Sequence, residues 1–178
     1  MSIHYKLFLL LFFIVAKPAF SQKLMTYKNS KPIPATTSWE FMCENYALSG
    51  TTNVQIAKTE KGGILKIAMQ TTDPSFYIAG TVYLYLADNS IIYCATKGIR
   101  ENKDNQIMGY FTFSEIEMNK LKKTTIQSIR FNINGKQKKF SSQIGNFTAT
   151  NKKVYFKVDT SKPFESYNTA QEIDALYK

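Results

Sequence analysis

The segment from residue 82 to residue 134 constrains the fold of this 178-residue chain more than any other part. Its signals, in chain order, are apolar runs at residues 82–86, 91–94 and 108–113, a helix start at Ser114 and an alternating run at residues 126–134. Short apolar runs bounded by turn residues are typical of β-strands. Further runs flank the segment at intervals of about ten residues, the spacing of a sandwich or barrel. We expect a mostly β, antiparallel, sandwich-like domain.

The first two runs predict a β-hairpin in the middle of the sheet. With a two-residue turn at Asp88-Asn89, Leu84 pairs with Tyr93. Asp-Asn is a weaker turn signal than Asn-Gly, so a four-residue loop at residues 87–90 remains an alternative. Both faces of the hairpin are apolar, which indicates cover on both sides. Five tyrosines that could instead form a sugar-stacking face are interpreted as core residues: Tyr83, Tyr85, Tyr93, Tyr110 and Tyr155.

Two capping boxes predict the helices. Ser114 has a glutamate three residues later, so its hydroxyl and that carboxylate can satisfy each other's backbone N–H groups. We expect Ile116 and Leu121 to dock this short helix on the sheet. Thr169 also has a glutamate three residues later and predicts a short helix through residue 176 in the C-terminal tail.

The N-terminus has the pattern of an export signal. Lys6 supplies positive charge, residues 7–16 are apolar, and the small residues Ala19 and Ser21 precede a cut before Gln22. Ten apolar residues span only about 15 Å as a helix, half of a bilayer core of about 30 Å, which disfavours a membrane anchor. We expect a periplasmic or secreted protein without a transmembrane span. The predicted organisation is a signal peptide at 1–21, an extended spacer or edge segment at 22–38, a β-rich domain at 39–160 and a tail at 161–178.

Positive charge is concentrated in the C-terminal third of the chain. Residues 120–162 contain eleven basic residues and one acid, Asp159, in a chain of formal net charge +10. Asn134-Gly135 is the strongest hairpin turn in the sequence and would place Arg130 opposite Lys139. Such a segment suggests an anionic partner, and a solvated lysine-rich face is the alternative. The anion-binding candidates are Arg130, Lys136, Lys138, Lys139, Lys152 and Lys153.

Cys43 and Cys94 are the only cysteines. Cys43 follows an alternating run that places Trp39, Phe41 and Cys43 on one face of a strand. In an oxidising compartment a cysteine pair is more often bridged than free, so we expect a Cys43–Cys94 disulfide, with two buried thiols as the alternative.

The composition excludes several catalytic chemistries. The single histidine, His4, lies in the expected signal peptide. The mature chain therefore lacks the histidine that a Ser-His-Asp or Cys-His site needs, and it has no Gly-rich phosphate loop. We expect no metal and no cofactor. Carboxylate pairs remain, because glycoside hydrolysis requires only two acids at a set separation. Glu40 and Glu44 lie too far apart on one strand to cooperate directly.

Residues 80–94, 113–123 and 126–140 carry a resemblance to small exported proteins of unassigned function from Bacteroidetes-type bacteria. The shared motifs are structural and imply no activity. The leading expectation is therefore a non-enzymatic binding or envelope-associated module with a basic face for an anionic envelope glycan, lipid surface or partner protein. Nucleic acid is disfavoured because of export. The alternative is a carboxylate-based hydrolase that acts on envelope glycans.

Overall fold

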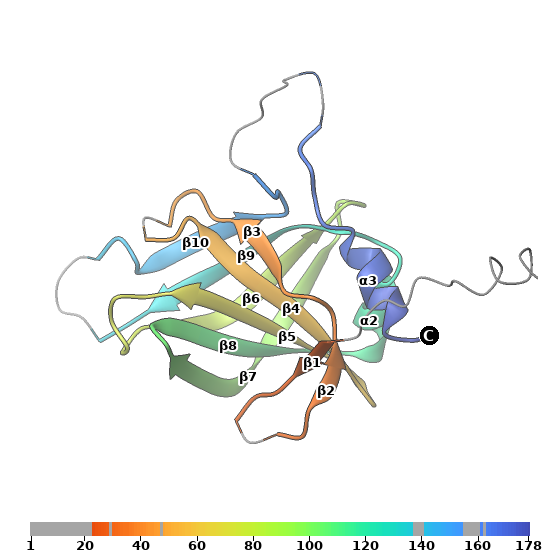
Figure 1. Cartoon of the computed structure of the whole chain (residues 1–178), viewed down its shortest axis with the longest axis horizontal. Helices are drawn as coiled ribbons and strands as arrows, with labels where there is room; N and C mark the ends of the chain where they lie inside the picture. The colour runs from red at the N-terminus through yellow and green to blue at the C-terminus, as the bar shows by residue number, and fades with distance from the viewer. Residues whose placement is uncertain (1–22, 29, 47, 137–140, 155–160, 162) are drawn as a thin grey trace, which may run out of the picture.

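The computed structural model describes residues 23–28, 30–46, 48–136, 141–154, 161 and 163–178. The described strands form one antiparallel sheet, and eight of them close into a barrel (Figure 1). The expected open sandwich is therefore wrong. Closure comes from the pairing of β4 (Thr51–Thr59) with β5 (Gly62–Gln70). These two strands are the first and the last of eight that each pair with the next, so their pairing completes the circle. A closed barrel leaves its strands without the unpaired edges of an open sheet.

The order around the barrel is β4-β3-β10-β9-β6-β7-β8-β5. The remaining strands are β3 (Trp39–Met42), β6 (Tyr77–Leu86), β7 (Ile91–Lys103), β8 (Gln106–Phe113), β9 (Ile126–Asn134) and β10 (Gly145–Thr150). Since β5 and β6 are not neighbours, residues 71–76 cross one end of the barrel. Helix α2 (Glu115–Leu121) connects β8 to β9 and crosses the other end, where α3 (Thr169–Ala175) joins it (Figure 1).

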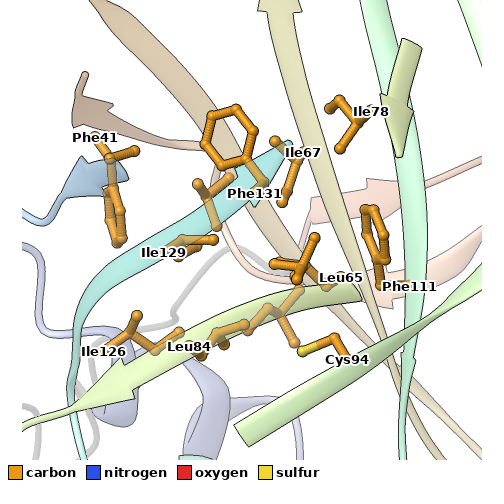
Figure 2. Packing of buried hydrophobic residues seen from close by; sticks show 14 of the residues in the cluster. Phe41, Leu65, Ile67, Ile78, Leu84, Cys94, Phe111, Ile126, Ile129 and Phe131 are labelled. Atoms are coloured by element: carbon orange, nitrogen blue, oxygen red, sulfur yellow. The ribbon is translucent and has the colours of Figure 1, made fainter. Parts of the chain in front are cut away.

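Side chains fill the barrel interior. In Figure 2, Leu65 of β5, Phe111 of the neighbouring β8 and Leu84 of β6 all lie in the barrel interior. Eight strands give an interior that is just wide enough for such filling. Met118 and Leu121 of α2, and Ile173 of α3, belong to the same cluster and close the end that they cross. The interior is thus a packed core of apolar side chains.

The segment at residues 22–38 contributes two short strands at the edge of the sheet. β1 (Lys23–Met25) pairs with β2 (Ile33–Ala35), and β2 meets β4 at Ala57. Met25 and Ala35 pack with Ala57, Ile64 and Tyr110 in a second cluster of buried residues. Ile64 therefore faces the opposite way from its neighbour Leu65, which belongs to the interior.

The hairpin of β6 and β7 takes neither expected loop, because both would pair Leu84 with Tyr93. Its register is shifted by one residue: the Leu86 N–H donates to the Ser90 carbonyl at 3.0 Å, and residues 87–89 turn the chain. Leu84 pairs with Ile92, and Tyr83 pairs with Tyr93. Because side chains alternate between faces, this register turns the apolar residues inward and the tyrosines outward. The expected cover on both sides is wrong, since Tyr93 is 62% exposed.

The expected two-residue turn at Asn134-Gly135 is also wrong. β9 pairs with β10, so Arg130 lies opposite Thr148 instead of Lys139. The backbone at Asn134 pairs with Tyr77 of β6. Lys138 and Lys139 lie outside the described residues. Here pairing with a distant strand overrides a strong local turn signal.

The first capping box is confirmed and the second is wrong. At α2 the Ser114 hydroxyl and the Glu117 carboxylate satisfy the expected backbone N–H groups, although Ile116 is 82% exposed and does not dock the helix. α3 begins after Asn168, whose side chain accepts from the backbone of residue 171. Glu172 has a different partner, Trp39.

Candidate functional site

A row of tyrosine and arginine side chains crosses the outer face of the barrel. Tyr93 of β7 pairs with Tyr83 of β6, Tyr83 pairs with Arg130 of β9, and Arg130 pairs with Thr148 of β10. Inward residues of these strands fill the core, so all four of these side chains point outward. The rings of Tyr83 and Tyr93 meet edge to face, with centroids 5.4 Å apart.

A β-bulge opens a groove beside this row. Ala79 pairs with Asn132 and Tyr83 pairs with Arg130, so three residues of β6 stand opposite Phe131 alone. Gly80, in the bulge, has φ +70°, a conformation that glycine adopts without strain. The resulting groove has a volume of about 380 Å³. Its lining residues are Thr81, Tyr83, Tyr85, Arg130, Phe131, Asn132 and Asn146.

The groove combines one unpaired cation with neutral polar groups. Arg130 is exposed and has no ion pair or hydrogen bond from its guanidinium to any described residue. No acidic residue lines the groove. The Asn132 amide nitrogen donates to the Asn146 side-chain oxygen at 3.2 Å, which leaves the Asn132 oxygen and the Asn146 nitrogen without a described partner. The arrangement favours a ligand that has an anionic group and hydroxyls.

The other anion-binding candidates do not join Arg130 in this groove. Lys152 lies 3.6 Å from the Glu44 carboxylate, and Lys153 lies 3.7 Å from the Glu165 carboxylate, so both ammonium groups are already paired. Lys136 is exposed. Of the four candidates that the structure describes, Arg130 lines a cavity of about 380 Å³ among the described residues.

The expected disulfide is wrong, because both cysteines are free and buried. Cys43 follows β3 and Cys94 lies on β7, and three strands separate β3 from β7 in either direction around the barrel. A disulfide requires Cα atoms about 4.4–6.8 Å apart, which opposite walls of a filled barrel do not provide. Burial raises the pKa of the Cys43 thiol to about 11 and also raises the pKa of Cys94, so neither is an activated nucleophile.

A second, polar cavity of about 230 Å³ lies at the end of the barrel crossed by residues 71–76. Asp104 is its only acidic lining residue, so the cavity lacks the pair of carboxylates that glycoside hydrolysis needs. Glu40 and Glu44 are exposed and line neither cavity. No group of three or more metal-ligating side chains occurs in the part of the chain that the structure describes.

The sequence contained a signal for the groove that its interpretation as core missed. Tyr83 and Tyr85 share a face because they are two residues apart on one strand. Tyr93 joins them in the observed register, in which it pairs with Tyr83, whereas both expected loops pair it with Leu84. Of the five tyrosines considered for a sugar-stacking face, Tyr110 is buried and Tyr155 lies outside the described residues.

No protein-family model, curated protein or solved structure matches the chain. The resemblance to exported bacterial proteins therefore stays a prediction. Among the described residues, no helix has the length and apolar character to cross a membrane. Residues 1–21, the expected signal peptide, lie outside the described part of the chain.

Proposed function

We propose that the protein is an exported, non-enzymatic binding module that holds an anionic partner in the groove around Arg130. The observation that carries this proposal is an exposed guanidinium without a partner among the described residues, in a groove that has no acidic lining residue. A planar guanidinium donates two parallel hydrogen bonds to a carboxylate, sulfate or phosphate. The flanking tyrosines and asparagines supply contacts for the rest of the partner.

Export is supported by the sequence of residues 1–21. The mass of the protein that is recovered from outside the cytoplasm of an expressing bacterium tests export. We expect a chain that begins at Gln22. A full-length chain that remains in the cytoplasm would contradict export, and it would leave the binding site to be tested separately.

Retention on an anionic resin tests the binding site, provided that general charge is controlled. The whole chain has a formal net charge of +10 and will bind such a resin through its lysines alone. Arg130→Glu and Lys23→Glu change the net charge equally, but Lys23 lies on β1, which is outside the barrel and pairs with β2. We expect Arg130→Glu to elute at a clearly lower salt concentration than Lys23→Glu. Equal elution of the two variants would overturn the proposal.

A further inference from the structure

We propose that the anionic partner is an acidic polysaccharide, with the carboxylate of one sugar on Arg130 and the ring of that sugar against the tyrosines. This inference rests on the function proposed above and adds the chemical class of the ligand. It is drawn from the number of charges in the groove, from its hydrogen-bonding groups and from the exposed ring of Tyr93 on the same face of the barrel.

The charge count favours one isolated acid group. Arg130 is the only cation that lines the groove. Nucleic acids and anionic membrane surfaces present closely spaced charges, and proteins bind them with several cations at once. A uronic-acid chain carries one carboxylate per acidic sugar and presents neutral hydroxyls between successive charges. A single guanidinium with neutral polar neighbours matches that spacing.

The hydrogen-bonding groups match sugar hydroxyls. A hydroxyl both donates and accepts, so a site that binds several of them needs both kinds of group. The Asn132 oxygen can accept and the Asn146 amide nitrogen can donate, since neither has a partner among the described residues. Thr81 and the Tyr83 and Tyr85 hydroxyls can do either. A simple anion such as phosphate would leave most of these groups unused.

The aromatic surface provides a place for the apolar face of a sugar ring. Tyr93 is 62% exposed, and its ring meets the ring of Tyr83 edge to face at an angle of 75°. Tyr83 in turn pairs with Arg130 across β6 and β9. Tyr83 thus lies between the Tyr93 ring and the Arg130 guanidinium on one row, and it lines the groove itself. The groove volume of about 380 Å³ lies at the lower end of the roughly 300–1,000 Å³ that is usual for small-molecule sites.

Calorimetric titration with an oligogalacturonate tests the inference. The comparison ligands are its methyl ester, which keeps the sugar and removes the charge, and polyglutamate, which keeps the charge and removes the sugar. We expect the oligogalacturonate to bind at least about tenfold more tightly than either.

Arg130→Lys should weaken binding because an ammonium cannot form the two parallel bonds. Tyr93→Ala should weaken binding of oligogalacturonate and leave polyglutamate unaffected. Lys23→Gln is the matched control, and circular dichroism checks that each variant is folded.

Two outcomes separate this inference from the proposed function. If polyglutamate, polyphosphate or phosphatidylglycerol vesicles bind as tightly as the oligogalacturonate, and Arg130→Gln weakens that binding while Tyr93→Ala does not, the sugar is wrong and the anionic site remains. If Arg130→Gln affects no anionic ligand more than Lys23→Gln does, both the ligand class and the proposed function are wrong.

Discussion

The carboxylate of Glu172 accepts a hydrogen bond from the indole Nε1 of Trp39 at 2.9 Å and ties α3 to the first strand of the barrel. Its other oxygen accepts from the Thr37 backbone N–H at 3.2 Å and from the Thr37 hydroxyl at 2.6 Å. A seven-residue helix has little stability alone, so these contacts and the burial of Ile173 hold α3 in place. Residues 133 positions apart thereby close one end of the barrel.

Glu172→Gln should destabilise the protein by about 1–2 kcal/mol, since a neutral acceptor forms weaker hydrogen bonds than a carboxylate. An amide has one accepting oxygen, whereas the indole and the Thr37 backbone each require an acceptor. Trp39 is the only tryptophan, so its fluorescence follows urea unfolding at the site of this contact. Glu60→Gln, at an exposed turn, is the matched control. Equal midpoints for the two variants would show that the carboxylate does not hold α3.

The two cysteines should be free in the purified protein. Under denaturing conditions without reductant, alkylation should modify both Cys43 and Cys94, as read by intact mass. In the folded protein at pH 8 both thiols should react slowly, because both are fully buried and burial raises their pKa values. A mass that lacks both modifications after denaturation would establish a bridge and would contradict the positions of β3 and β7.

Local features of the fold were predictable and its closure was not. The Ser114 cap and the alternation of Trp39 and Phe41 depend on residues a few positions apart, so the sequence displays them directly. Closure depends on β4 meeting β5 while β5 also meets β8, and a strand that pairs twice has the same periodicity as a strand that pairs once. Sandwich and barrel therefore share one sequence pattern.

The candidate site depended on register, which the sequence specified weakly. A register shifted by one residue from the expected one pairs Tyr83 with Tyr93 and places both on the outer face. Arg130 was one of the candidates, but its neighbours in the groove were not predicted, because the pairing of β9 with β6 joins residues far apart in the chain. The bulge that opens the groove has only Gly80 as a local signal, and one glycine in a strand has several explanations.

Gly62→Ala should be strongly destabilising. Gly62 has φ +139°, and an added Cβ would overlap the backbone carbonyl oxygen of Phe113, which cannot move without disturbing β8. Gly98→Ala is the control, because Gly98 also has positive φ, +71°, but an added Cβ there meets nothing within 4 Å. Backbone strain of about 1–3 kcal/mol applies to both variants, and overlap adds about 1–3 kcal/mol at Gly62 alone. Urea unfolding measures the difference, and equal losses would show that β5 and β8 can separate there.

Stability should fall at alkaline pH because of a buried tyrosine. Burial, and then the nearby Cys43 thiol, raise the pKa of Tyr46 from 10.0 to about 12. The unfolded chain therefore loses this proton near pH 10, while the folded chain keeps it until about pH 12. Over that interval the folded state binds more protons, so the free energy of unfolding decreases as pH rises. The contribution is fully present below about pH 10.

Tyr46→Phe separates this titration from other alkaline effects. The Tyr46 hydroxyl donates to the Gln70 carbonyl at 2.5 Å, so its removal should cost about 1 kcal/mol at pH 8. The same variant should lose stability less steeply than the parent chain between pH 10 and 11, as measured by urea unfolding at each pH. Tyr93→Phe, which removes an exposed hydroxyl, should keep the parent's slope. If Tyr46→Phe keeps that slope too, the alkaline loss arises from other groups, and the hydroxyl of Tyr46 contributes only its hydrogen bond.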